Sequence, residues 1–240
     1  MRYSYYPGCS LKAAAAEYDL SLRAVLAALD VELAELPDWN CCGATPAGRA
    51  STVLSLGLAA RNLALAQEAG RDLLAPCAAC YNRLRRAEHA LASGGPRRRA
   101  LEEAANFRYT GATRVVSAPE AVCGVGLRAV ADRVRRPLEG LRVACYYGCL
   151  LVRPTEAAAA DDPDAPVLLD RLMLALGAAP VAWAYKTDCC GAGLGVTRPE
   201  TARRLVDRLL AAADEAGAGA VVTACNQCQL NLEARRSAAA

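Results

Sequence analysis

The chain carries one cysteine pattern twice, and the spacing of the two copies is the strongest constraint on its fold. Each copy has a single cysteine, then an adjacent pair followed by glycine, then a C-x-x-C motif. The pair and the C-x-x-C motif recur 148 positions later, whereas the single cysteine recurs 140 positions later. Such a repeat predicts two similar half-domains, with eight extra residues in a loop of the second copy near residues 155–166. The copies consist of Cys9, Cys41, Cys42, Cys77 and Cys80, and of Cys149, Cys189, Cys190, Cys225 and Cys228.

The adjacent cysteines are unsuited to a disulfide bond with each other. Neighbouring Cα atoms are about 3.8 Å apart, whereas unstrained disulfides need roughly 4.4–6.8 Å. The first residues, MRYSYYPGCS, lack the apolar core of a secretory signal, and no window is long and apolar enough to span a bilayer. We therefore expect a cytoplasmic protein with no direct membrane span. In that reducing compartment, twelve cysteines indicate metal ligands or redox centres rather than a disulfide framework.

Strand-like and helix-like segments alternate in the same order in both copies. Strands are expected at 2–6, 31–36, 72–76, 140–147, 179–185 and 220–224. Helices are expected at 13–29, 49–69, 78–91, 167–176, 200–216 and within 225–236. This alternation predicts an α/β fold, with two similar Rossmann-like half-domains that have parallel sheets and are related by a pseudo-twofold axis. We place the half-domains at residues 1–138 and 139–240, and interpret 94–116 as a turn and connecting region.

In this arrangement the repeated cysteines lie where open α/β sheets bind their ligands. Each falls in a loop at the carboxyl end of a strand or in the first turn of the next helix. The pseudo-twofold axis then predicts that both sets face a shared cleft. The glycines after the pairs, Gly43 and Gly191, have a function here: they let the backbone approach an inorganic core and donate N–H groups to its sulfurs. The run GAGLG at 191–195 is otherwise a simple turn, because it lacks a full G-x-G-x-x-G pattern.

Five cysteines per copy exceed the four that an ordinary iron–sulfur cluster or a structural zinc ion takes. Either one thiolate is spare or the cluster is not a cubane. Zinc in one site stays an alternative, although it leaves the fifth cysteine without a function. The one histidine, His89, lies on a charged helix and is expected at the surface, so a catalytic Cys–His pair is not predicted. The net charge of +3 is too small to indicate nucleic-acid binding.

Several stretches together resemble a known family. YYPGCSL, DWNCCGA, APCAACYNRL, ACYYGCLLVRP, DCCGAG and ACNQCQLNL are similar to the motifs of cysteine-rich CCG-domain proteins, and most of all to those of the heterodisulfide reductase B subunit. The resemblance covers essentially the whole chain. It implies that each motif holds a noncubane [4Fe–4S] cluster in which adjacent thiolates ligate neighbouring parts of one open cluster. The implied ligands are Cys9, Cys41, Cys42, Cys77 and Cys80 for the first cluster, and Cys149, Cys189, Cys190, Cys225 and Cys228 for the second.

The resemblance also implies an activity and partners. It implies the catalytic component of an oxidoreductase that reductively cleaves a small disulfide, CoM-S-S-CoB or a related one, to two thiols. Electrons would arrive from a ferredoxin-like iron–sulfur protein, the C subunit, and a flavin-containing protein, the A subunit. Two other functions stay open: an electron-transfer or docking module of another oxidoreductase complex, and a zinc-stabilised scaffold. Two complete motifs in a chain with no other domain favour the enzyme.

Two cysteines lie outside the repeat. Cys123 is expected to be a small buried core residue. Cys145, four residues before Cys149 on an expected strand, is interpreted as structural, with a function as exchange ligand as the alternative. Arg153, before Pro154, is expected to form a surface salt bridge, or else to contact an anionic group of the substrate.

Overall fold

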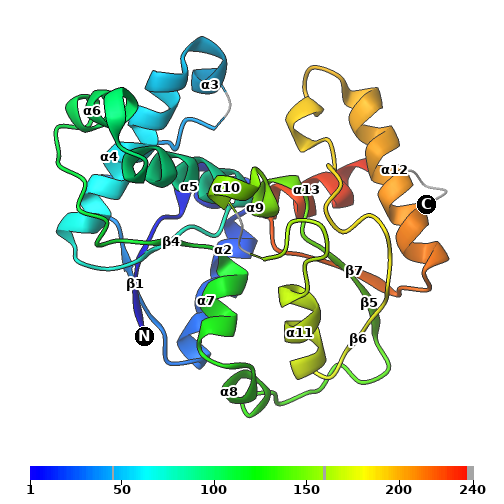
Figure 1. The fold of residues 1–240 in the computed structure, drawn as a ribbon. Helices are drawn as coiled ribbons and strands as arrows, with labels where there is room; N and C mark the ends of the chain where they lie inside the picture. The colour runs from blue at the N-terminus through cyan, green and yellow to red at the C-terminus, as the bar shows by residue number, and fades with distance from the viewer. Residues whose placement is uncertain (45, 159–160, 237–240) are drawn as a thin grey trace.

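The computed structural model describes residues 1–44, 46–158 and 161–236. Its strands form two sheets, one in each half of the molecule (Figure 1). The first sheet has the order β2-β1-β3-β4 and the second has the order β6-β5-β7, and every pair is parallel. The prediction of two Rossmann-like halves with parallel sheets is confirmed. The strands are β1 (Arg2–Tyr5), β2 (Glu32–Glu35), β3 (Leu73–Leu74), β4 (Val115–Val116), β5 (Arg142–Tyr146), β6 (Ala179–Pro180) and β7 (Ala220–Thr223).

The helices follow the strands in a repeated order. In each half, the central strand is followed by a short helix and then a longer one, with α10 as an extra short helix between them in the second half. Strands β2 and β6 precede the long helices α4 and α12, and strands β3 and β7 precede the helices that carry C-x-x-C. The first half contains α1 (Gly8–Leu11), α2 (Ala16–Ala28), α3 (Pro46–Ala50), α4 (Thr52–Glu68), α5 (Ala78–Ala92), α6 (Gly95–Ala104), α7 (Ala118–Gly124) and α8 (Leu127–Ala131). The second contains α9 (Cys149–Val152), α10 (Thr155–Ala158), α11 (Leu168–Ala175), α12 (Pro199–Glu215) and α13 (Asn226–Arg235).

The extra residues of the second copy lie between α9 and α11, where the structure has α10 and the following loop. Residues 159–160 of this expected insertion are outside the described residues. Within the described ranges, no helix is both long enough and apolar enough to cross a membrane.

The two halves contact each other reciprocally. Helix α1 contacts α13, and α5 contacts α9 and α10, so that each half places its C-x-x-C helix against the first cysteine's helix of the other. Helices α5, α9, α10 and α13 lie near the centre of the molecule in Figure 1. Asn226 Nδ2 donates to Ser10 Oγ at 2.7 Å, and Asn82 Nδ2 donates to the carbonyl of Leu150 at 2.9 Å. Such exchange of equivalent surfaces is what a pseudo-twofold axis produces. One cluster of buried side chains, including Leu73 and Val143 of the two sheets, continues across both halves.

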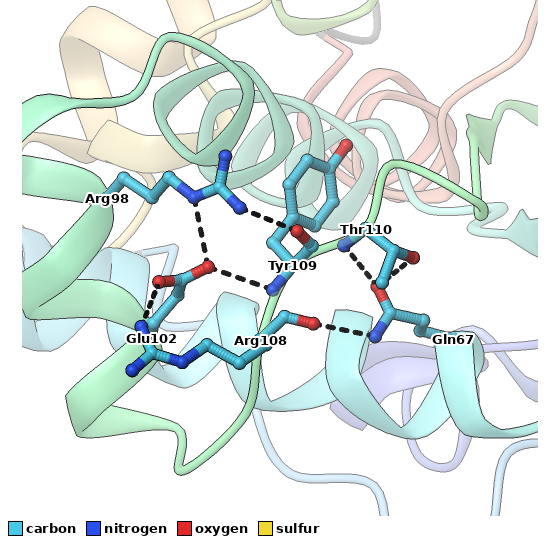
Figure 2. Close-up of polar contacts among 6 residues, drawn as sticks. All are labelled: Gln67, Arg98, Glu102, Arg108, Tyr109 and Thr110. Atoms are coloured by element: carbon cyan, nitrogen blue, oxygen red, sulfur yellow. Dashed lines mark hydrogen bonds and ion pairs between the residues drawn. The ribbon is translucent and has the colours of Figure 1, made fainter.

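The segment 94–116 is more ordered than a turn and connecting region, so that interpretation is wrong. It contains α6, and its end forms β4, which pairs with β3 at the edge of the first sheet. The buried carboxylate of Glu102 organises this region (Figure 2). It accepts hydrogen bonds from the Tyr109 backbone N–H and from Arg98 and Arg108, at 2.9–3.1 Å, and in that order they lower the pKa of the carboxyl group. Gln67 of α4 holds the next turn by bonding Arg108 O and Thr110 N.

Strand β6 is shorter than expected, and one side chain explains why. The parallel ladder runs from Ala179 N to Leu141 O and from Val181 N to Val143 O, both at 2.9 Å. The next acceptor in that series is the carbonyl of Cys145, but the indole Nε1 of Trp183 takes it, at 3.0 Å. A side-chain donor therefore replaces the backbone donor, and the chain leaves the sheet.

The expected helix 49–69 is divided at Ser51: residues 49–50 end α3, and α4 begins at Thr52, where Ser51 acts as the N-cap and accepts from Leu54 N at 3.3 Å.

Strand β5, which begins the second sheet along the chain, starts at Arg142, shortly after residue 139. Helices α7 and α8 of the first half pack against α11 of the second. We retain the division into 1–138 and 139–240 as a proposal on this basis.

Candidate functional site

The end of the central strand in each half is held to the cysteine-pair loop by a buried tyrosine. Tyr6 donates its hydroxyl hydrogen bond to the carbonyl of Asn40 at 2.8 Å, and Tyr146 donates to the carbonyl of Asp188 at 2.6 Å. The two acceptors directly precede Cys41 and Cys189. Sequence reasoning assigned these tyrosines no role, although the doubled YY before the first cysteine of each copy was a signal that could have found them. The hydroxyls fix both pairs relative to the strand ends.

The first cysteine set, defined as Cys9, Cys41, Cys42, Cys77 and Cys80, is brought together by three elements. Cys9 lies in α1, the pair lies in the loop after β2, and the C-x-x-C motif begins α5. The sulfurs of Cys42 and Cys80 are 3.3 Å apart, and Cys80 also interacts with Cys77. Cys9 is close enough to interact with Cys41, Cys42 and Cys77.

The second cysteine set, defined as Cys149, Cys189, Cys190, Cys225 and Cys228, repeats this arrangement. The sulfurs of Cys190 and Cys228 are 3.5 Å apart, and Cys149 interacts with both members of the pair. In each set three sulfurs are buried, while the first cysteine and the first member of the pair are more exposed. Each set is therefore accessible to solvent from one side. Their function as cluster ligands stays a prediction.

The sulfurs of each set are grouped as contacting pairs. Among the described residues, no three His, Cys, Asp or Glu side chains are arranged to hold a single metal ion. The contact with Cys80 lowers the pKa of Cys42 to about 7, and the contact with Cys149 lowers that of Cys189 to about 6. The pKa values of Cys80 and Cys149 are raised by the same contacts. Each pair thus has one sulfur that favours the thiolate and one that keeps its proton.

The glycines after the pairs pack against helices rather than against the sulfurs. Gly43 and Gly191 have φ values of 73° and 79°, which a residue with a side chain rarely adopts. A Cβ on Gly43 would lie 3.1 Å from Ser55 O of α4, and one on Gly191 would lie 3.1 Å from Ala202 Cα of α12. The expected N–H donation to sulfur occurs at Gly191, which bonds Cys189 Sγ at 3.3 Å. The GAGLG run forms a 3-10 turn at Ala192–Leu194.

The close approach of backbone to sulfur occurs at two other glycines. A Cβ on Gly8 would lie 3.0 Å from Cys80 Sγ, and one on Gly148 would lie 3.3 Å from Cys228 Sγ. Both glycines directly precede the first cysteine of their copy. The missing side chains therefore leave room beside the second sulfur of each C-x-x-C motif.

The two cysteine sets adjoin across the interface between the halves. The contact with Cys228 lowers the pKa of Cys225 most, and the backbone N–H of Ala78, next to Cys77 in the other half, lies close enough to the Cys225 sulfur to help lower it further. Tyr18 lies between the sets and donates to the carbonyl of Ala224 at 3.2 Å. Burial raises the pKa of Tyr18 most, and the nearby Cys225 and Cys77 raise it further. Both C-x-x-C motifs therefore meet at this interface.

A groove of about 570 Å³ opens between the halves beside the second set. Asn82 and Arg86 of α5 line one side, and Cys149, Arg153 and Glu156 belong to the other. Arg153 pairs with the exposed Asp164 at 3.3 Å, which is the surface salt bridge expected from the sequence. The groove reaches the second set through Cys149, and its lining does not include a cysteine of the first set, so this groove is not the predicted cleft that both sets share.

The residues predicted to lie outside the sites do so. Cys145 is fully buried in β5, where Asp170 and Lys186 rather than the repeated cysteines are its charged neighbours. His89 is exposed on α5. Cys123 is only partly buried, contrary to the expected core position, because α7 packs on α11 at the edge of the interface and leaves one side of the thiol open. Its sulfur lies 3.9 Å from the carbonyl of Leu168.

We expect Cys123 and Cys145 to resist alkylation at neutral pH. Burial raises the pKa of Cys123 to about 11, with Asp161 adding to the shift, and burial followed by Asp170 raises that of Cys145 to about 12. Because the thiolate is the reacting form, the rate at Cys123 should rise about tenfold per pH unit from pH 7 until it levels off near the pKa. Timed iodoacetamide labelling with peptide mass spectrometry measures this. Labelling of Cys123 at pH 7 as fast as a free cysteine peptide would contradict it.

Comparison with known proteins agrees with the duplicated arrangement. The cysteine-rich CCG domain family matches residues 3–85 and 143–233. A protein of Archaeoglobus profundus, described as like the heterodisulfide reductase B subunit, is 30% identical over 97% of this chain and 81% of its own length. The B subunit of the ferredoxin/F(420)H(2)-dependent CoB-CoM heterodisulfide reductase of Methanosarcina acetivorans is 30% identical over 97% of this chain and 79% of its own.

A relative with a different printed function is equally similar. The 8-methylmenaquinol:fumarate reductase membrane anchor subunit of Wolinella succinogenes is 30% identical over 96% of this chain and 81% of its own length. Among solved structures, a hypothetical protein from Helicobacter pylori has a TM-score of 0.72 at 13% identity, over 96% of this chain. This chain spans 42% of that protein, and the likeness concerns the fold alone.

Proposed function

The chain belongs to the cysteine-rich CCG-domain family that includes the heterodisulfide reductase B subunit, and from this membership we propose that it is the catalytic component of a disulfide-reducing complex. The coarser function, an oxidoreductase module with iron–sulfur chemistry, follows from the family. The proposal adds the reaction: reductive cleavage of a small disulfide, CoM-S-S-CoB or a related one, to two thiols. It also adds two noncubane [4Fe–4S] clusters, one at each cysteine set.

One observation carries the proposal: two complete five-cysteine sets adjoin across the interface between the halves. Tyr18 lies near both Cys77 and Cys225 and donates to the carbonyl of Ala224 at 3.2 Å, so the C-x-x-C motif of one half lies beside that of the other. A single electron relay needs one such set. Two sets side by side suit a reaction in which two sulfur atoms separate and each takes one electron.

The residues present fit an iron–sulfur group in three respects. The donors are thiols, which is the chemistry that such clusters require. Gly8 and Gly148 leave open the space beside Cys80 and Cys228 that a Cβ would fill. The Nε of Arg83, near Cys42, is buried without a hydrogen-bond partner among the described residues, and an anionic inorganic sulfide is a suitable acceptor.

The overall reaction converts RS–SR′, two electrons and two protons into RSH and R′SH. Bound clusters would supply the electrons singly, and we propose that they come from a ferredoxin-like C subunit and a flavin-containing A subunit. The chain's own residues position the reaction: Tyr6 and Tyr146 hold the two pair loops, and the exposed sides at Cys9 and Cys149 leave room for a substrate sulfur. We place the chain in the cytoplasm, where thiols stay reduced.

This route differs from thiol–disulfide exchange, which needs a free thiolate that attacks the disulfide. Burial, which is partial for Cys123 and complete for Cys145, raises the pKa values of these two cysteines outside the sets. Neither is suited to attack a disulfide at neutral pH. Electron delivery is therefore the mechanism that we favour.

A second candidate function is an electron-transfer or docking module of another oxidoreductase complex. The relative named as a fumarate reductase membrane anchor subunit favours it. This module would bind clusters and pass electrons without cleaving a disulfide. A zinc-stabilised scaffold is the third candidate, and it predicts zinc in place of iron.

Anaerobic purification followed by metal and turnover assays separates the three candidates. We expect about eight iron and about eight sulfide ions per chain, from two four-iron clusters. We also expect EPR signals that change when a candidate thiol is added, and disulfide cleavage driven by a reduced viologen dye. Iron with no cleavage of any tested disulfide would support the electron-transfer module. Stoichiometric zinc without iron would support the scaffold.

A further inference from the structure

The two cysteine sets are alike in their sulfurs but differ in the charge beside them. Because the pair and the C-x-x-C motif repeat at one spacing, residues 78–87 of α5 have equivalents in α13 that lie 148 positions later. Arg83, three residues after Cys80, has Asn231 as its equivalent, three residues after Cys228. Both side chains reach the pair loop of their own half. At this position a cation in the first half is therefore replaced by a neutral amide in the second. The arginine of α13 that does reach the second loop, Arg235, donates to the carbonyl of Gly195, five residues after Cys190.

Arg83 is partly buried against the loop that carries Cys41 and Cys42. Its Nη2 donates to the carbonyl of Ala44, two residues after Cys42, at 3.3 Å. Its guanidinium is close enough to Cys42 to interact with it electrostatically. Gly48 in α3 leaves room for the guanidinium, since a Cβ there would lie 3.3 Å from Nη2. The arginine is thus enclosed by the loop, α3 and its own helix.

Asn231 occupies the equivalent position in the second half without bringing a charge. It is 7% exposed, and its Nδ2 donates to the carbonyl of Cys190 at 2.7 Å. The charged side chains that line the groove beside Cys149 are two of each sign, namely Arg86, Arg153, Glu156 and Asp164. Asp188, which precedes Cys189, is half exposed and lies 3.8 Å from Arg208. Exposed charges that are paired in this way largely cancel and are screened by salt.

We propose that Arg83 makes the two sites unequal, so that a cluster at the first set has the higher reduction potential and holds the first electron. The inference rests on the proposed function, because it assumes that both sets hold clusters. In this proposal Arg83 does not ligate iron; it places a positive charge beside the first cysteine set. The second site, with Asn231, would then hold the lower-potential cluster. The cluster of the N-terminal half would thus be reduced before the cluster of the C-terminal half.

The physical reason is the sign of the charge change on reduction. Each electron makes a cluster more negative, and a nearby cation stabilises the reduced form more than the oxidised form. The interaction is stronger at a partly buried site than in water, because the effective dielectric constant is lower. An asparagine supplies a dipole only. The difference in charge between Arg83 and Asn231 therefore favours reduction of a cluster at the first site.

Potentiometric EPR titration of the full chain tests this inference. The first cluster's signal is identified as the one that remains in Cys190→Ser. With Arg83→Gln, we expect the ratio of reduced to oxidised first cluster at a fixed potential to fall about tenfold, which corresponds to about 59 mV for one electron. The second cluster should not shift. Arg83→Lys, which keeps the charge, should retain most of the original potential.

The matched control is Arg97→Gln, which removes one exposed arginine from α6 of the same half. An Arg83→Gln shift no larger than the control's would overturn the inference, as would an equal shift in Arg83→Lys. If the Arg83→Gln protein does not bind a cluster at the first set, the Asn231→Lys variant tests the inference instead. The reduction potential of its second cluster should rise, and an unchanged potential overturns the inference. Failure of the proposed function is distinguishable, because wild-type protein would then lack either iron or disulfide cleavage.

Discussion

Replacing Cys42 or Cys190 by serine is expected to abolish disulfide cleavage and to remove one cluster only. Each residue is buried and contacts the second sulfur of its own C-x-x-C motif, at 3.3 Å and 3.5 Å. A serine hydroxyl is a much poorer iron ligand than a thiolate, so the iron content should fall from about eight to about four per chain. Turnover should be lost in both variants, since the proposed reaction uses both sites. Iron analysis and EPR of anaerobically purified protein measure the loss.

The controls are the same change at the two cysteines outside the sets. Cys123→Ser and Cys145→Ser should keep both EPR signals, the full iron content and most of the turnover. Cys123→Ala should likewise change stability only modestly, because a partly buried thiol acts as a small apolar side chain. A covalent substrate adduct trapped on Cys123 or Cys145, with activity lost when that residue is changed, would exclude cluster-based cleavage. It would favour thiol–disulfide exchange instead.

Replacing Asp170 by alanine is expected to destabilise the second half by about 2–3 kcal/mol. Asp170 accepts from Lys186 Nζ and from the Tyr147 hydroxyl, both at 2.7 Å, and its side chain is 16% exposed. Its loss leaves a mostly buried ammonium group without a counter-ion. The effect should extend to the second set, because the carbonyl of Lys186 accepts the N–H groups of Tyr147 and Gly148, directly before Cys149.

Denaturant unfolding of the purified protein measures this change, with Asp164→Ala as the control. Asp164 also pairs with a cation, Arg153, but its side chain is 86% exposed. Exposed ion pairs contribute little, so the control should lose no more than about 0.5 kcal/mol. Equal losses in the two variants would mean that the Lys186–Asp170 pair does not stabilise this half. A weaker second-cluster signal in Asp170→Ala would further indicate that the network positions Cys149.

The duplicated cysteines predicted the two halves, and the alternation of strand-like and helix-like segments predicted the α/β class. Parallel strands carry their chain to the same sheet edge, so cysteines that follow β1, β3, β5 and β7 had to gather there. The five members of each set could therefore be named from their spacing. Helix propensity and apolar periodicity identified α2, α5 and α12 for the same reason, because these signals are local in the sequence.

Only the tertiary structure determined which side chains complete these local elements. Residues 95–104 formed a helix whose Glu102 accepts from the backbone N–H of Tyr109 in the following turn, and 115–116 formed a strand because β3 supplies its backbone partners. Strand β6 ended early because Trp183 took a carbonyl of β5. Arg83 and Asn231 occupy equivalent places in the repeat, but only the tertiary structure places each side chain in contact with the cysteine-pair loop of its own half. Spacing records which residues follow a strand, but charge and hydrogen bonding act through space, between residues that the chain keeps far apart.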